Sequence, residues 1–348
     1  MGLKRHLMEL PKLVLIGYGV IEELREVIER LGASGTALVV SGPNVKAKLE
    51  GRIEGALEGY GHEWFVVDRA SMDRVEFGLG LAKGIGAGLV IGFGGGKSID
   101  TAKLIAYRLK LPFISIPTSA SHDGMASPFA SVKDGGRPYS MVTKPPACVI
   151  SDIEIIASAP PRFIRSGCGD LLAKLTAVRD WEIARDDVGE YFGNYAANLA
   201  RLSATIVMNE AKRIGSLEEE GVRDLVEALI SAGIASGIAG SSRPCSGSEH
   251  LFSHALDVIA PGKGLHGEKC GIGAIMMAKL QGGDWEAIHK ALEEVGAPTR
   301  ASDLGIGEDE VVKALLLAPR IRDRYTILNR VKLGAEEAYR LARETGVI

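Results

Sequence analysis

The chain has 348 residues, of which 46% are hydrophobic, and its 41 Lys and Arg residues nearly balance 44 Asp and Glu residues. A chain of this length exceeds what one compact core usually holds, so we expect two domains. The balanced charge argues against a nucleic-acid-binding protein, which would carry a basic stripe, and favours an enzyme with a small-molecule substrate.

The N-terminal segment is charged and the uncharged stretches are short. Lys4, Arg5, His6 and Glu9 stand where a secretory signal would need an apolar run. The uncharged stretch at residues 228–242 is shorter than a membrane span and rich in Gly and Ser. We therefore expect no membrane span and a cytoplasmic location.

The first part of the chain alternates short apolar runs with amphipathic segments. The runs cover residues 13–16, 37–40, 64–67, 89–91, 113–116 and 148–150. Between the first four runs, apolar residues recur at spacings of three and four, as in Leu24, Val27, Ile28 and Leu31. This alternation predicts a Rossmann-like α/β domain, residues 1–159, whose parallel sheet is covered on both faces.

The periodicity changes after Pro160-Pro161, a pair that does not favour continuing a regular element. Long helical patterns follow at residues 162–185, 191–214, 218–239 and 248–259, with shorter ones up to the C-terminus. We therefore expect an all-helical second domain, residues 160–348.

A glycine-rich turn follows the fourth apolar run. Residues 89–100, LVIGFGGGKSID, read as a buried strand, a turn and the first turn of a helix, where backbone N–H groups can hold a pyrophosphate. A Walker A loop fails because Ile91 replaces its first glycine, and the Rossmann fingerprint fails because Lys97 replaces its last. The alternative is an ordinary turn that is merely rich in glycine.

A second turn of small residues follows the next predicted strand. Residues 117–124 read PTSASHDG. At neighbouring strand ends, the two turns would form one crevice at the carboxyl edge of the sheet, where open α/β folds bind ligands. The alternative is a solvated loop.

Three histidines have the spacing of metal ligands. His250 and His254 are four residues apart, so on a helix they share one face, and His266 lies near the start of a further helix. A zinc protease is excluded because Leu251 replaces the glutamate that such an enzyme carries after the first histidine. The alternative is a packed or surface helix with incidental histidines.

Asp170 is a candidate third ligand. A catalytic zinc needs three protein ligands and an open position, and N or O donors serve where thiolates are not suitably spaced. The cysteines (Cys148, Cys168, Cys245 and Cys270) have no C-x-x-C pair, so we expect reduced thiols. Asp170 lies near the predicted start of a long apolar helix, and its alternative role is an N-cap or first-turn charge.

Taken together, these motifs resemble the glycerol dehydrogenase and dehydroquinate synthase superfamily over nearly the whole chain. The resemblance is carried by residues 94–100, residues 117–121, Gly169-Asp170, His250-x-x-x-His254 and His266-Gly267-Glu268. Within that group, residues 121–127 (SHDGMAS) and 247–250 (GSEH) look most like archaeal sn-glycerol-1-phosphate dehydrogenases. The resemblance implies a dehydroquinate synthase-like architecture.

The resemblance also implies roles for individual residues. Those implied for the dinucleotide are Gly95, Gly96, Lys97, Ser98, Ile99, Asp100, Thr118, Ser119, Ala120, Ser121 and Ser127. Asp123, Asp170 and His254 would face the substrate. A metal would be held by Asp170, His250 and His266.

The chemistry expected from this resemblance is a hydride transfer. Zinc would draw charge from the carbonyl of dihydroxyacetone phosphate while NAD(P)H delivers hydride to the carbonyl carbon. We expect His254 to relay the proton to the oxygen, directly or through water. The product, sn-glycerol 1-phosphate, is in that family the backbone of archaeal membrane lipids.

Two binding questions concern charge. Lys133, Arg137 and Lys144 are candidates for the substrate phosphate, or equally a solvated cluster. Residues 41–44, SGPN, lack the acidic residue that usually grips the ribose 2′-hydroxyl, so we expect NADP(H) to be accepted as well as NAD(H).

Other functions remain to be distinguished. A glycerol dehydrogenase acting on the unphosphorylated substrate would share the fold and the metal chemistry. A dehydroquinate synthase would return its NAD unchanged, so net NADH consumption would exclude it. A non-catalytic NAD(H) sensor would bind the dinucleotide without turnover. Symmetric self-association into a homo-oligomer is a general expectation for such a protein.

Overall fold

The computed structural model describes residues 6–134 and 137–348, with side chains described outside 133–139. The described residues form two compact units. The first contains the chain up to Ser119, Gly124–Ala159 and Ser236–Ser241, and the second contains Ala120–Asp123, Pro160–Ala235 and Ser242–Ile348. The predicted two-domain division at residues 159 and 160 stays an interpretation of the sequence, and the segments exchanged between the two units were not anticipated.

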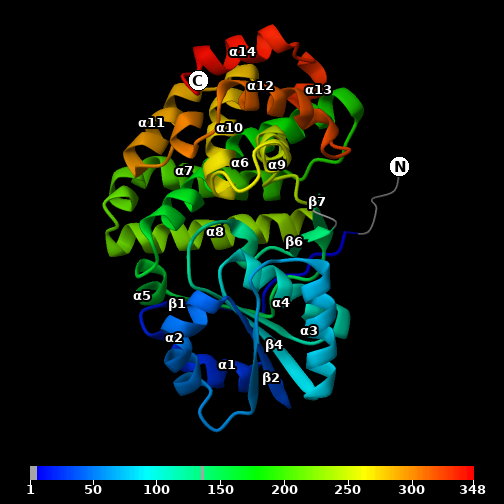
Figure 1. Ribbon diagram of the computed structural model, residues 1–348, viewed down its shortest axis with the longest axis vertical. Helices are drawn as coiled ribbons and strands as arrows, with labels where there is room; N and C mark the ends of the chain where they lie inside the picture. Colours follow the sequence, from blue (N-terminus) through cyan, green and yellow to red (C-terminus); the bar gives the residue numbers. More distant parts are fainter. Residues whose placement is uncertain (1–5, 135–136) are drawn as a thin grey trace. The chain divides into compact units, whose positions relative to one another are not determined.

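The first unit is built on a parallel six-stranded sheet (Figure 1). The strand order is β1-β8-β5-β4-β2-β3. The strands are β1 Leu13–Gly17, β2 Thr36–Ser41, β3 His62–Val66, β4 Ala87–Gly94, β5 Phe113–Pro117 and β8 Cys148–Asp152. Each of the six predicted apolar runs contributes one strand, so the predicted α/β sheet is confirmed.

Both faces of this sheet are covered. The helices of the unit include η1 Val20–Glu23, α1 Leu24–Arg30, α2 Pro43–Ala56, α3 Met72–Gly84, α4 Gly96–Leu109 and α5 Ile153–Ala157. Ala37 and Val39 of β2 pack in one apolar cluster with α1 and α2, and Leu38 and Val40 pack in the other with α3 and α4. A strand buried on both faces needs apolar residues at every position, which explains the unbroken runs in the sequence.

A hairpin was not predicted. The strands β6 Phe129–Asp134 and β7 Arg137–Val142 pair antiparallel. Ala130 and Val132 of β6 are buried in the same cluster as α3 and α4. Packing against these helices therefore stabilises a short strand pair whose own sequence signal is weak.

The second unit is helical. Its long helices are α6 Pro161–Val188, α7 Asn194–Gly215, α8 Glu219–Ala239, whose last turn belongs to the first unit, α9 Ser248–Ile259 and α10 His266–Leu280. Shorter elements are η2 Asp123–Met125 at the junction of the two units, then α11 Trp285–Val295, η3 Ala301–Leu304, α12 Glu308–Leu317, η4 Ala318–Arg320, α13 Ile327–Val331 and α14 Ala335–Glu344. The predicted succession of helices is confirmed, and α6 packs against both α9 and α10.

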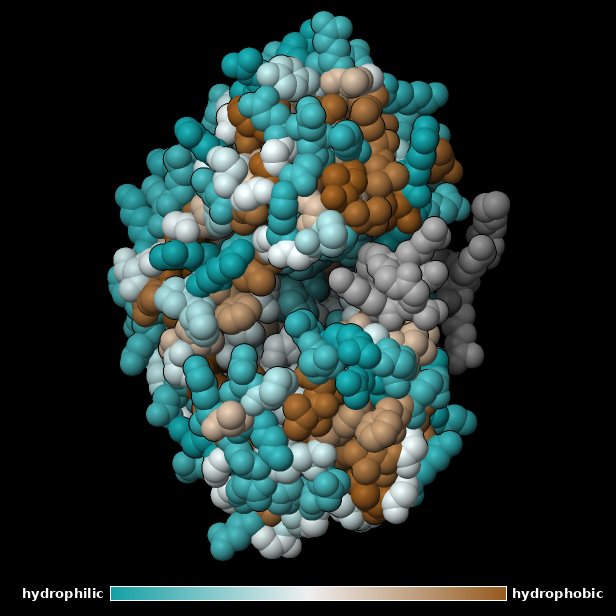
Figure 2. All heavy atoms as spheres, viewed as in Figure 1, coloured by the Kyte–Doolittle hydropathy of each residue, from teal (hydrophilic) through white to brown (hydrophobic). Residues whose placement is uncertain are grey.

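The visible face of the molecule is mostly hydrophilic, with apolar residues in separate patches (Figure 2). Large exposed apolar side chains lie on several elements, among them Phe77 on α3 and Tyr195 on α7. Within the part of the chain that is described, no helix has the length and apolar character needed to cross a membrane.

Candidate active site

The glycine turn joins β4 to α4 in the first unit. Gly94 has φ +153°, and a Cβ atom there would lie 2.7 Å from Ser98 Oγ, so only glycine fits without strain. Gly95 is the N-cap residue of α4, and no side chain caps the helix. The Ser98 N–H donates to the Gly95 carbonyl oxygen at 3.0 Å, and phosphate binding by the N–H groups that precede it stays a prediction.

The second turn lies beside the first. β5 is the neighbour of β4 in the sheet, and the Thr118 N–H donates a hydrogen bond to the Gly94 carbonyl oxygen at 3.1 Å. A Cβ atom on Gly95 would lie 3.6 Å from Ser119 Oγ. The structure thus brings the two turns together at the carboxyl ends of adjacent strands.

Other residues implied for the dinucleotide occupy different surroundings. Lys97 is exposed, whereas Asp100 is buried and accepts a hydrogen bond from the Ser131 N–H at 3.0 Å. Asp100 therefore holds β6 against α4, a structural task that sequence analysis missed. Ser127 is buried near the start of β6, and Ala120 and Ser121 belong to the helical unit. Nucleotide contacts by these residues stay predictions.

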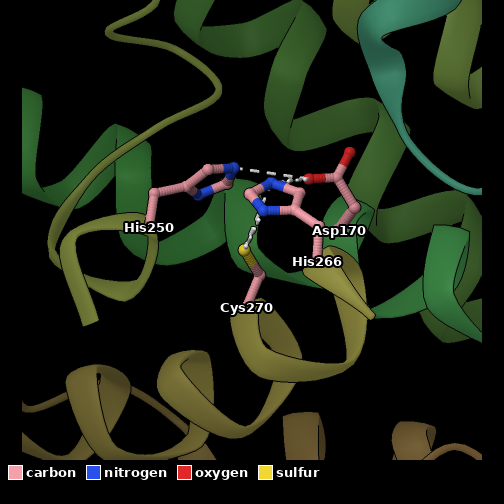
Figure 3. Close-up of side chains that lie close together, drawn as sticks. All are labelled: Asp170, His250, His266 and Cys270. Atoms are coloured by element: carbon pink, nitrogen blue, oxygen red, sulfur yellow. Dashed lines mark hydrogen bonds and ion pairs between the residues drawn. The ribbon is translucent and has the colours of Figure 1, made fainter. Parts of the chain in front are cut away.

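The candidate metal centre lies in the helical unit and is drawn in Figure 3. Asp170 of α6, His250 of α9, and His266 and Cys270 of α10 each offer a ligand atom, and these atoms lie within 4.8 Å of one another. Asp170 Oδ1 is 3.4 Å from His250 Nε2 and 3.9 Å from His266 Nε2. The three predicted ligands are thus brought together, with Cys270 as an unpredicted neighbour.

The separation of these atoms suits a shared cation. Donors placed about 2.0–2.1 Å from a tetrahedral zinc ion lie roughly 3.3 Å apart, close to the observed distances. A carboxylate and two imidazoles are also a ligand set that catalytic zinc sites use. The residues present therefore fit a divalent metal.

Burial and mutual charge interactions shift the pKa values of the groups at this centre. Burial alone would raise the pKa of Asp170, but Lys174 and His250 hold it well below its ordinary value. Burial opposes charging of His250, yet Cys270 and Asp170 raise its pKa well above normal. Burial and the charge of His250 lower the pKa of His266, so that ring is neutral and keeps a lone pair for coordination.

Asp170 lies well inside α6, which begins at Pro161. The alternative role of Asp170 as an N-cap or first-turn charge is therefore wrong. The backbones of α6 and α10 approach closely beside the site, because a Cβ atom on Gly169 would lie 2.3 Å from the Gly267 carbonyl oxygen. This close crossing of the helices sets Asp170 next to His266.

Lys174 is a site residue that sequence analysis missed. It is fully buried one helical turn after Asp170, and its Nζ lies 3.0 Å from Asp170 Oδ1 and 2.8 Å from Asp123 Oδ2. The Asp123 N–H also donates to Asp170 Oδ2 at 3.0 Å. The predicted substrate residue Asp123 is thus adjacent to the metal centre, and the spacing of four residues was the available signal for Lys174.

Glu249 was also missed. Its Oε1 lies 2.7 Å from His250 Nδ1 and accepts a hydrogen bond from the Gly247 N–H at 2.6 Å, while Oε2 accepts one from Thr176 Oγ1 at 2.9 Å. Because Nδ1 is engaged by the carboxylate, His250 presents Nε2 toward Asp170. A carboxylate behind a histidine is a common way to orient a metal ligand.

His254 lies beside the centre, with its ring centroid 5.8 Å from that of His266. Its Nε2 accepts a hydrogen bond from Arg322 Nη2 at 3.2 Å, and its Nδ1 is 3.6 Å from Asp257 Oδ2. Burial lowers the pKa of His254 to about 4. The ring is therefore neutral at neutral pH.

The three candidates for the substrate phosphate lack structural support. Lys144 belongs to the first unit, where it pairs with Glu9 at 2.9 Å and its side chain is 64% exposed. The side chains of Lys133 and Arg137 lie outside the described residues. None of the three is therefore supported as the phosphate ligand.

Comparison with known proteins gives one family match over part of the chain and relatives that cover nearly all of it. The family model described as iron-containing alcohol dehydrogenase matches residues 15–160. A Hyperthermus butylicus protein named glycerol-1-phosphate dehydrogenase (NAD(P)+) is 52% identical over 346 residues, covering 99% of both chains. A Sulfurisphaera tokodaii protein of the same name is 47% identical, covering 100% of both.

Solved structures share the fold at low sequence identity. A probable glycerol dehydrogenase from Sinorhizobium meliloti has a TM-score of 0.82 at 22% identity, covering 98% of both chains. Sulfoacetaldehyde reductase from Bifidobacterium kashiwanohense, solved with NAD+, has a TM-score of 0.79 at 18% identity, covering 98% of this chain and 99% of the other. These likenesses concern the fold alone.

Proposed function

The chain belongs to the glycerol-1-phosphate dehydrogenase family, and on this basis we propose that it reduces dihydroxyacetone phosphate to sn-glycerol 1-phosphate with NAD(P)H. The observation that carries the proposal is the cluster of Asp170, His250 and the half-buried His266, which joins three predicted ligands from three helices. The glycine turn before α4 provides a separate site suited to a dinucleotide phosphate.

Asp170, His250 and His266 would hold the metal, for which zinc is our proposal. When bound, the metal supplies Lewis-acid polarisation of the substrate carbonyl, and the reduced nicotinamide supplies the hydride. Glu249 fixes the His250 ring, and Lys174 fixes Asp170 and Asp123. These buried contacts orient the donor atoms before the substrate arrives, which reduces the reorganisation needed during the reaction.

His254 is the proposed proton relay to the substrate oxygen. Its ring is neutral at neutral pH, and Nε2 is engaged by Arg322. In the reduction, Nε2 must therefore leave the Arg322 contact, take a proton from water and pass that proton to the substrate oxygen. If His254→Ala turns over at the rate of the parent protein, this role is excluded.

The test is to follow NADPH and NADH absorbance with dihydroxyacetone phosphate, dihydroxyacetone and glycerol offered separately. We expect oxidation that strongly prefers the phosphorylated ketone, with product that is the sn-1 enantiomer. Preference for the unphosphorylated compounds would instead assign a glycerol dehydrogenase. Binding of NAD(H) without turnover would assign a sensor, and turnover without net NADH consumption would indicate a dehydroquinate synthase.

The proposal also covers the location of the enzyme, the use of its product and its oligomeric state. We place its action in the cytoplasm and its product in the backbone of archaeal membrane lipids. A symmetric homo-oligomer is the expected assembly, because most oligomeric enzymes are closed and symmetric. Light scattering of the purified protein measures this, and a monomeric mass would contradict it.

A further inference from the structure

Arg322 is a partly buried cation beside His254. It lies in the segment between η4 and α13, and its Nη2 donates a hydrogen bond to the neutral ring of His254. Burial lowers the pKa of Arg322, and no carboxylate among the described residues counters this effect. A guanidinium held away from water without an acidic partner is costly, so its retention calls for an anionic ligand.

Two lysines near the centre already contact carboxylates. Lys174 contacts the carboxylates of Asp123 and Asp170, and Lys269 pairs with Asp257. Arg322 therefore differs from these lysines, because its charge is still available to a ligand.

The segment that carries Arg322 is fixed by the neighbouring residues. Arg324 donates hydrogen bonds to the Ser246 carbonyl oxygen and to Ser242 Oγ, and Arg243 donates one to the Tyr325 carbonyl oxygen at 2.8 Å. These backbone contacts hold the segment close to the loop that precedes α9. The guanidinium of Arg322 is thus preorganised rather than free to swing into solvent.

Arginine charges also gather in this segment. Burial lowers the pKa of Arg324 to about 10, and repulsion by Arg243 and Arg322 contributes to the shift. Glu190 pairs with Arg243, whereas Arg322 contacts His254. An anion bound at Arg322 would relieve part of this repulsion.

We propose that Arg322 binds the phosphate group of a phosphorylated ketone whose carbonyl lies at the metal centre. The ring of His254 neighbours both groups, since its Nε2 is 3.2 Å from Arg322 Nη2 and its centroid is 5.8 Å from that of His266. In a triose phosphate, three bonds separate the carbonyl carbon from phosphorus. One such molecule would place its phosphate at Arg322 and its carbonyl at the metal centre. A planar guanidinium is also well suited to bind two phosphate oxygens.

This inference rests on the proposed function, and its test compares two substrates. In the metal-loaded, full-length protein, Arg322→Gln should lower kcat/KM for dihydroxyacetone phosphate about 100-fold or more, mainly through KM. For dihydroxyacetone, the loss in kcat/KM should be at least about tenfold smaller, because no phosphate contact is lost and the glutamine amide can still donate to His254 Nε2. Arg322→Lys should give an intermediate loss, since the charge remains but the planar fork does not.

Arg320→Gln is the matched control. Arg320 is an exposed arginine of η4 on the same segment, and we expect its substitution to leave both substrates unaffected. The unfolding temperature of ligand-free Arg322→Gln should be no lower than that of the parent protein, because an uncompensated buried charge has been removed. A large drop would instead indicate a structural role and overturn the proposal.

A binding measurement separates this proposal from the proposed function. Inorganic phosphate should raise the unfolding temperature of the parent protein and of Arg320→Gln, but not that of Arg322→Gln. If the parent protein does not prefer the phosphorylated ketone, the proposed function fails. In that case an anion site at Arg322 is still supported if phosphate raises the unfolding temperature of the parent protein but not that of Arg322→Gln. Equal loss of activity on both ketones, or an unchanged phosphate effect, would overturn the inference.

Discussion

The two carboxylate oxygens of Asp170 have different contacts. Oδ1 faces His250, His266 and Lys174, whereas Oδ2 accepts the Asp123 N–H. The carboxylate thereby joins the metal ligands to the neighbouring substrate residue. Removing its charge should affect the metal more than the fold, because the helix contacts around it remain.

Asp170→Asn should lose its metal. The amide lacks the negative charge that balances the cation, so we expect affinity for zinc to fall by more than about 100-fold, and turnover to fall with it. Cys270→Ser is the matched control, since the three proposed ligands do not include this thiol. Metal analysis after dialysis checks both variants, and metal retained by Asp170→Asn but lost from Cys270→Ser would reverse the ligand assignment.

Glu249 acts on the metal through His250. Burial would raise the pKa of Glu249, but the hydrogen bond with His250 keeps the pKa below its ordinary value, so the carboxylate is charged behind the ring. Glu249→Gln should weaken zinc affinity about 10- to 100-fold while leaving the three ligands in place. Titration with a competing chelator measures this, and an unchanged affinity would show that Glu249 is only structural.

At the scale of elements, the metal centre depends on the close crossing of α6 and α10. Glycines at the crossing allow the backbones to approach, and His266 is the first residue of α10. Any side chain at Gly169 would press on the backbone of the opposite helix and displace Asp170 from His266. Stability and metal binding should therefore change together at this position.

Gly169→Ala tests this crossing. Its new methyl group would meet a carbonyl oxygen, and we expect a loss of about 3 kcal/mol in the free energy of unfolding, with weaker zinc binding. Gly51→Ala is the control, because Gly51 lies in α2 with open space around it and should gain roughly 0.5–1 kcal/mol. Chemical denaturation measures the free energy of unfolding of both variants. Equal changes in the two would show that the crossing of α6 and α10 does not require glycine at position 169.

We expect the end of β2 to determine which dinucleotide the first unit accepts. Gly42, the N-cap residue of α2, has an ordinary φ of −82°, and a Cβ atom there would make only normal contacts. Gly42→Asp places a carboxylate where a 2′-phosphate would approach, so kcat/KM with NADPH should fall about tenfold relative to NADH. Gly42→Asn, which has the same shape without the charge, should show no such change, and a matching shift in both variants would exclude a charge effect.

For the whole molecule, the regular elements were the most predictable feature. The six strands are unbroken apolar runs because both faces of the sheet are buried, and the helices carry a clear period of 3.6. The hairpin β6–β7 was missed because its stability comes from packing against α3 and α4. Likewise, the exchange of residues 120–123 and 236–241 between the two units has no local signal.

The candidate site was predictable only where its residues follow a short spacing. His250 and His254 share a helix face, and His266 was expected near a helix start. Asp170 was one candidate with an alternative capping role, and the family resemblance gave it most of its support. Lys174 and Cys270 lie four residues after a proposed ligand and could have been suspected. Arg322 reaches His254 across 68 positions, so its role becomes visible only in the folded chain.

The most direct test of the account is to strip the protein of metal and add zinc in steps while following NADPH oxidation with dihydroxyacetone phosphate. We predict no turnover in the stripped protein and a rise to a plateau at about one zinc per chain, as expected for a single catalytic site. Asp170→Asn should stay inactive throughout the titration. Full turnover by the metal-free protein would contradict the central claim that the cluster of Asp170, His250 and His266 is a catalytic metal site.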